Sequence, residues 1–106
     1  MPGIATDTMT LWRRVVEDED HARWERHALT GVRVEPMRGS RAAQPGPTPS
    51  DALTAYVFAD LDVRPGDRVA CGLSASGEPT EGSYEVTDVR RYTLGTRLHH
   101  LEVEAR

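Results

Sequence analysis

The chain has 106 residues, of which 17 are acidic and 13 basic, and its formal net charge at pH 7 is -4. This length predicts one domain, and a hydrophobic fraction of 38% gives it a small core whose burial a partner or further copies would complete. The acidic balance argues against a protein that holds nucleic acid by neutralising phosphates, and no apolar run reaches the roughly 20 residues that span a bilayer.

The N-terminus and the cysteine content indicate the cellular compartment. Residues 1–10 have neither a basic start nor an apolar stretch, so we expect no signal peptide. The single cysteine, Cys71, excludes an intrachain disulfide and cannot form a cysteine metal site alone. Both features favour a cytoplasmic protein.

The chain is expected to begin with a short arm and a strand. Residues 1–8 carry a proline, a glycine and polar side chains, which predicts a flexible N-terminal arm. Residues 9–16 alternate around Trp12, which is typical of a strand. The acidic run that follows, with Asp18 and Glu19 at its centre, predicts a solvated hairpin turn.

Residues 22–29 have the composition of a helix but the length of a strand. An antiparallel return of the first strand would place Trp24 near Trp12 as a cross-strand pair, and we favour this interpretation. The period of two resumes in residues 32–34. The intervening Gly31 then marks a bulge or bend, since glycine inside a strand pattern commonly does so.

Residues 35–51 contain almost no apolar side chains and predict one long loop. Residues 44–50 hold three of the seven prolines, which excludes a helix or a central strand there. Loops of this length in small domains tend to be functional or disordered. A partner-contacting loop and a plain linker both stay open on these grounds.

The next elements have clear signals. Residues 52–58 alternate, with Leu53 and Val57 on one face, and predict a strand. Residues 64–67 read Arg-Pro-Gly-Asp, which places proline and glycine as a type II turn requires. Residues 68–71 predict a short strand.

The last third of the chain predicts a loop and a hairpin. Residues 72–82 are rich in glycine and serine and predict a loop. Residues 84–92 predict a strand with Val86 and Val89 on opposite faces. After a turn, residues 98–103 predict the last strand.

Five to seven short strands with frequent turns predict an all-β fold. We expect a small antiparallel β-barrel or sandwich of about six strands, forming a single domain over residues 9–106. The candidate core consists of Trp12, Trp24, Leu53, Val57, Val69, Val86, Leu101 and Val103.

The residue types that carry chemistry do not form a recognisable constellation. His99 and His100 are adjacent in a strand, so they should point to opposite faces and not share a metal ion. Cys71 lies in an apolar-bounded strand, where a small buried side chain is the usual role. The loop 72–82 has no helix after it and cannot form a phosphate cradle. We therefore expect no enzyme activity, no cofactor and no metal ion.

Several short motifs follow one another in a distinctive order. They occupy residues 10–12, 24–32, 50–58, 63–72, 84–92 and 95–104. With this order, the chain resembles the small head–tail connector proteins of tailed bacteriophages, which include head-closure (stopper) and minor capsid proteins.

The resemblance implies a structural protein of the virion neck. It implies a small β-barrel that assembles in the host cytoplasm into a homo-oligomeric ring, sixfold or twelvefold. The ring would lie between the portal–adaptor complex above and the tail terminator or tail tube below. DNA would pass through it, or be retained, without sequence-specific binding, and no membrane would be involved. Acidic residues facing the channel would keep it from gripping DNA.

The resemblance also suggests where partners bind. The candidate contact residues lie in loop 35–51 and in the acidic turn, and are Arg38, Arg41, Gln44, Pro45, Pro47, Pro49, Asp18 and Glu19. Two alternatives stay open: a tail terminator or tail-completion protein of the same neck, and a non-viral small β-barrel binding module.

Overall fold

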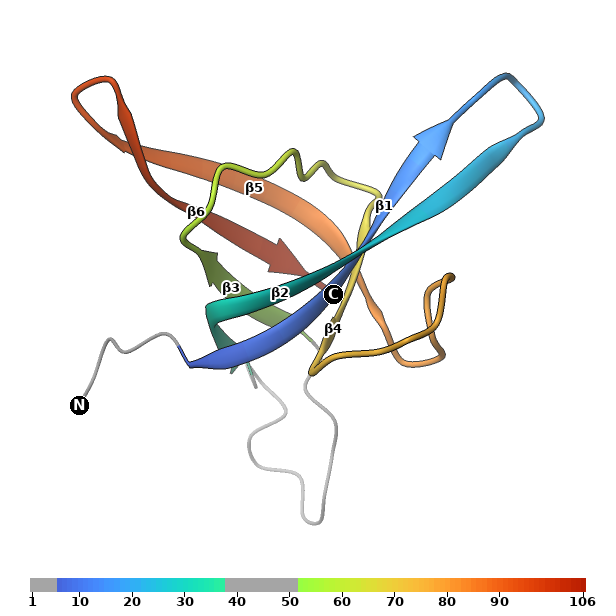
Figure 1. Ribbon diagram of the computed structural model, residues 1–106, viewed down its shortest axis with the longest axis horizontal. Coiled ribbons are helices and arrows are strands. Elements are labelled where there is room, and N and C mark those ends of the chain that lie inside the picture. Colours follow the sequence, from blue (N-terminus) through green and yellow to red (C-terminus); the bar gives the residue numbers. More distant parts are fainter. Residues whose placement is uncertain (1–5, 38–51) are drawn as a thin grey trace, which may run out of the picture.

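Six antiparallel strands close into a barrel (Figure 1). The structure is a computed structural model that describes residues 6–37 and 52–106. The strands are β1 (Asp7–Val16), β2 (Ala22–Met37), β3 (Ala52–Val57), β4 (Arg68–Cys71), β5 (Tyr84–Leu94) and β6 (Arg97–Ala105). Their order around the barrel is β1-β2-β3-β6-β5-β4. The prediction of an all-β fold of about six antiparallel strands is therefore confirmed.

Two hairpins extend beyond the barrel as arms (Figure 1). Within the described chain, β4 pairs with β1 over residues 9–12 and β3 pairs with β2 only from Arg33 onward. Residues 13–25 therefore form a two-stranded β1–β2 arm. In the same way, β3 pairs with β6 only from Leu101 onward, which leaves residues 91–100 as the β5–β6 arm.

Inward-facing aliphatic side chains fill the barrel. Six of the eight candidate core residues belong to the buried cluster: Leu53, Val57, Val69, Val86, Leu101 and Val103. The cluster also contains Met9, Leu11, Val32, Ala55, Val63 and Ala105. Period-two alternation identified these positions because each strand of a filled barrel buries one face.

The two tryptophans lie elsewhere. Trp12 is fully buried, but on the outer face of β1, where its Nε1 donates a hydrogen bond of 2.9 Å to the carbonyl oxygen of Ser76. Trp24 is only half-buried, because its place opposite Arg14 lies on the β1–β2 arm, past the barrel. The prediction that Trp24 is a core residue is therefore wrong. The two indoles share a face but are not directly paired, since Trp12 lies opposite Arg26.

The loop between β4 and β5 covers the outer face of β1. Thr10 Oγ1 donates to the carbonyl oxygen of Gly72 at 2.8 Å and accepts from the Ser74 backbone N–H at 2.8 Å. These bonds and the Ser76 bond hold the loop over the Trp12 indole. A second, smaller burial site therefore lies outside the barrel wall.

Two glycines act as the sequence predicted. Gly31 has φ +65° and is the extra residue where the β1–β2 register shifts, since Asp7 pairs with Val32 and Thr8 with Thr30. This is a glycine bulge. Gly66 has φ +98° in the Arg-Pro-Gly-Asp turn, which agrees with type II geometry.

Two predicted boundaries are wrong. β1 begins at Asp7 instead of residue 9, and β2 continues to Met37 instead of ending before residue 35. The reason is pairing: Asp7 Oδ2 accepts from the Val34 backbone N–H at 2.9 Å, and β3 pairs with β2 through Met37. The remainder of the predicted loop, residues 38–51, lies outside the described residues, as do residues 1–5 of the predicted arm.

A bulge in β5 corrects the prediction for Val89. Val86 pairs with Ala105 and Asp88 with Glu104, so Thr87 is an extra residue. The bulge changes the phase of the strand. Val89 consequently packs against the core, as Val86 does, instead of facing the other way.

Candidate functional site

The acidic turn lies at the tip of the β1–β2 arm. The Asp18 carboxylate accepts from the Asp20 backbone N–H at 2.9 Å and lies 2.7 Å from Nδ1 of His21. Hydrogen bonding from His21, and then from the Asp20 N–H, holds the pKa of Asp18 below its usual value. Asp18 and Glu19 are both exposed, and Asp18 is already engaged within the turn.

The other candidate contact residues cannot be placed. Arg38, Arg41, Gln44, Pro45, Pro47 and Pro49 lie outside the described residues. Their role as a partner contact stays a prediction. Of that set, the structure locates the acidic turn alone.

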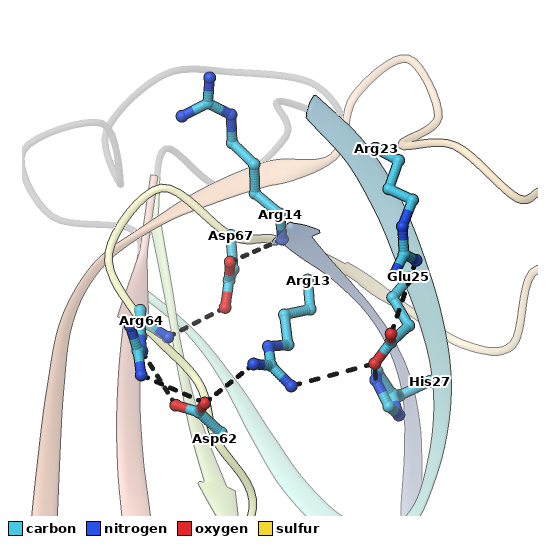
Figure 2. A network of polar contacts seen from close by, with 8 residues as sticks. All are labelled: Arg13, Arg14, Arg23, Glu25, His27, Asp62, Arg64 and Asp67. Atoms are coloured by element: carbon cyan, nitrogen blue, oxygen red, sulfur yellow. Dashed lines mark hydrogen bonds and ion pairs between the residues drawn. The ribbon is translucent and has the colours of Figure 1, made fainter. Parts of the chain in front are cut away.

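A network of charged side chains joins the β1–β2 arm to the barrel (Figure 2). Arg13 lies 3.0 Å from Asp62 and 3.9 Å from Glu25. Glu25 in turn lies 2.9 Å from His27, and Asp62 lies 3.1 Å from Arg64. The network therefore links β1, β2 and the segment between β3 and β4.

The charges in this network are paired and partly solvated. The hydrogen bond from Arg64 lowers the pKa of Asp62, with desolvation opposing the shift and the charges of Arg64 and Arg13 adding to it. A carboxyl that stays ionised so readily does not suit a general acid. Half-exposed ion pairs each contribute little to stability, so the network orients the arm more than it stabilises the fold.

Asp67 makes a stronger attachment that the sequence did not reveal. Its side chain is buried and accepts two backbone hydrogen bonds, from Arg14 and from Arg64, each of 2.9 Å. Figure 2 shows the carboxylate between β1 and the turn. Asp67 was expected only as a turn residue. Its turn position was readable, but its bond to β1 depends on a contact 53 residues away in sequence.

Aromatic rings and imidazoles gather at the base of the β5–β6 arm. Tyr92 stacks on His100 with ring centres 4.7 Å apart and planes 12° from parallel. Tyr56 and Phe58 approach the same imidazole, with ring centres at 6.1 and 5.9 Å. His99 meets His100 edge to face at 4.9 Å. We call these five residues the aromatic–imidazole cluster.

The prediction that His99 and His100 point apart is wrong. Tyr92 pairs with His100 and Thr93 with Leu98, which leaves His99 as an extra residue in β6. This bulge redirects the side chain, and the two Nδ1 atoms lie 2.7 Å apart. No glycine marks the position, so the sequence offered no signal for it.

Cys71 is exposed, not buried as expected. It is the last residue of β4 and borders a pocket of about 400 Å³ that Asp7, Thr8 and Val34 also line. Partial desolvation, with a smaller effect of the Asp7 carboxylate, raises the pKa of the thiol. A thiol held in the protonated form does not suit a nucleophile.

Two further kinds of feature are absent from the described residues. Among them, no three His, Cys, Asp or Glu side chains converge as a metal site. No helix in residues 6–37 and 52–106 is long and apolar enough to cross a membrane. No family model, curated protein or solved structure matches the chain.

Proposed function

We propose that the chain is a structural subunit of the neck of a tailed bacteriophage, and specifically its head-closure (stopper) protein. In this proposal, copies form a homo-oligomeric ring between the portal–adaptor complex and the tail. Two lines of support combine: the order of the sequence motifs and the shape of the fold. The protein acts by assembly and catalyses no reaction.

The observation that carries the proposal is the pair of arms. Each arm ends in an exposed aliphatic side chain: Val16 on the β1–β2 arm is 60% exposed and Leu94 on the β5–β6 arm is 67% exposed. Two-stranded hairpins are marginal by themselves, and their outer edges are free to pair or pack. Neighbouring copies in a ring would bury both tips and cover these edges.

The net charge of the chain also supports the proposal of a ring around DNA. The net charge of -4 is repeated in every copy, and the acidic turn projects at the end of an arm. A ring with acidic groups toward its channel would let DNA pass without holding it. An arginine-lined channel would contradict this part of the proposal.

Charge placed at the arm tips tests the proposal. We expect Val16→Glu and Leu94→Glu each to impair ring assembly, measured by sedimentation velocity, and to lower the yield of tailed particles in complementation. Ala75→Glu is the matched control, since it adds the same charge at an exposed position of the loop between β4 and β5, outside both arms. Normal particle yields from both tip variants would contradict the proposal.

The alternatives predict different outcomes. If the chain is a tail terminator or tail-completion protein, particles made without it should have full heads, and the defect should lie on the tail side of the joint. A non-viral binding module would complement no virion defect at all. Fractionation of heads and tails made without the chain separates these outcomes, since loss of head closure leaves heads that release their DNA.

A further inference from the structure

The two imidazoles of the aromatic–imidazole cluster bring their Nδ1 atoms into direct contact. The Nδ1 atoms of His99 and His100 lie 2.7 Å apart, as two ligands of one ion or as a hydrogen-bonded pair would. In the hydrogen-bonded pair, one Nδ1 carries a proton and the other a lone pair. Transfer of that proton to Nε2 of its own ring leaves both rings neutral. Both Nδ1 atoms then carry a lone pair.

The spacing favours a particular coordination geometry. Metal–nitrogen bonds of about 2.0–2.1 Å place two nitrogens at right angles about 2.8–3.0 Å apart, and tetrahedral ligands about 3.3–3.4 Å apart. The observed 2.7 Å is nearer the right-angled arrangement. Square-planar and tetragonal sites with nitrogen ligands are typical of Cu²⁺ and Ni²⁺.

We propose that His99 and His100 chelate a divalent Cu²⁺ or Ni²⁺ ion through their two Nδ1 atoms, at the base of the β5–β6 arm. The other coordination positions would hold water, because no third His, Cys, Asp or Glu of the described chain joins the pair. This site does not depend on the neck role.

Neighbouring rings hold the two ligands in place. Tyr92 stacks on the His100 ring, and Phe58 lies 5.9 Å from it and 6.4 Å from the His99 ring. The bulge fixes the backbone between the two ligands. Ligands with restricted orientation lose less freedom when a metal ion binds.

Nickel titration of the tag-free, full-length chain by calorimetry tests the proposal. We expect one Ni²⁺ per chain, with affinity reduced more than about tenfold in H99Q and in H100Q, since loss of even an outer-shell partner has effects of this size. H21Q is the matched control, because His21 is exposed on the other arm and contacts a carboxylate. Its affinity should be unchanged.

Copper provides a second readout. The electron paramagnetic resonance spectrum of the Cu²⁺ complex should show coupling to two imidazole nitrogens, and to one in H99Q. His99 is exposed, so this variant should keep its fold, which circular dichroism checks. Absence of Ni²⁺ binding by the unmodified chain, equal binding by H99Q, or loss of binding in H21Q would each overturn the proposal.

Discussion

The β1–β2 arm and the β5–β6 arm have the same two-stranded shape but are held to the barrel by partly different contacts. The ion pair between Arg13 and Asp62 attaches the first, together with the buried Asp67 carboxylate. Contacts of Tyr56 and Phe58 with the His100 ring attach the second, together with an ion pair of 2.6 Å between Arg91 and Asp60. Both arms therefore have an exposed ion pair to the segment between β3 and β4, but only the first has a buried carboxylate and only the second has ring contacts.

The two arms also present different surfaces to a partner. The β1–β2 arm presents acidic groups at its tip, which steer a partner of opposite charge over distance and weaken as salt rises. The β5–β6 arm presents the ring of Tyr92, which is 40% exposed, and Phe58, which contacts His100 at the base of the arm, is 49% exposed. Aromatic groups of this kind supply contact area at an interface. Two different surfaces suit a subunit with different neighbours on different sides.

The largest effect is expected where the β1–β2 arm meets the barrel. Trp12→Ala should destabilise the fold by about 3–5 kcal/mol, because it removes a fully buried indole and leaves the loop over it without support. Denaturant unfolding measures the change. Trp24→Ala, on the same face but half-buried, should cost clearly less. Equal losses would show that the arm is packed as firmly as the barrel.

The second effect concerns the buried attachment of that arm. Asp67→Ala should cost about 1–3 kcal/mol, because two backbone N–H groups lose their acceptor. Asp62→Ala is the control, since ion pairs this exposed contribute little to stability and their loss should be clearly smaller. If Asp62 proved the more important of the two, the exposed network would be the real attachment.

The third effect belongs to the β5–β6 arm. Tyr92→Leu should cost about 0.5–1.5 kcal/mol, the usual value of an aromatic pair beyond its buried area. The loss should be the same at low and high salt. Arg13→Gln on the other arm should have an effect that fades as salt rises. A salt-dependent loss in Tyr92→Leu would remove the distinction between the arms.

The smallest effect is at the acidic turn. The lowered pKa of Asp18 means that its stabilising contribution is present above the ordinary Asp pKa and is lost as pH falls through the folded-state pKa. His21→Gln should raise the pKa of Asp18 toward the ordinary value, because it removes the principal hydrogen bond. Carboxyl titration followed by nuclear magnetic resonance measures this. An unchanged Asp18 titration in His21→Gln would assign the shift to the turn backbone alone.

The two arms also show which features the sequence could predict. The bulge near the N-terminal hairpin was predictable, because Gly31 supplies a positive φ that few other residues adopt. The bulges at Thr87 and His99 were not, because ordinary side chains occupy both and pairing with a distant strand decides their position. The two wrong predictions of side-chain direction on β5 and β6 both follow from these bulges. Val89 turned inward, and His99 turned toward His100.

The core was predictable from patterns within single strands, whereas the contacts that attach the arms depend on how separate strands pair. Alternation within one strand identifies the buried face, as it did for Leu53 and Val57. The exposure of Trp24 and the bond from Asp67 to β1 depend on where β1 and β2 extend beyond the strands that pair with them in the barrel. That length difference creates the arms, and it is a property of the closed sheet.

The most direct test of the neck assignment is an image reconstruction of the tailed particle whose genome encodes this chain. The account predicts a ring of copies between the adaptor and the tail, with Val16 and Leu94 buried against neighbouring subunits and acidic groups toward the channel. A neck without this barrel, or a ring in which both arm tips remain in solvent, would contradict it.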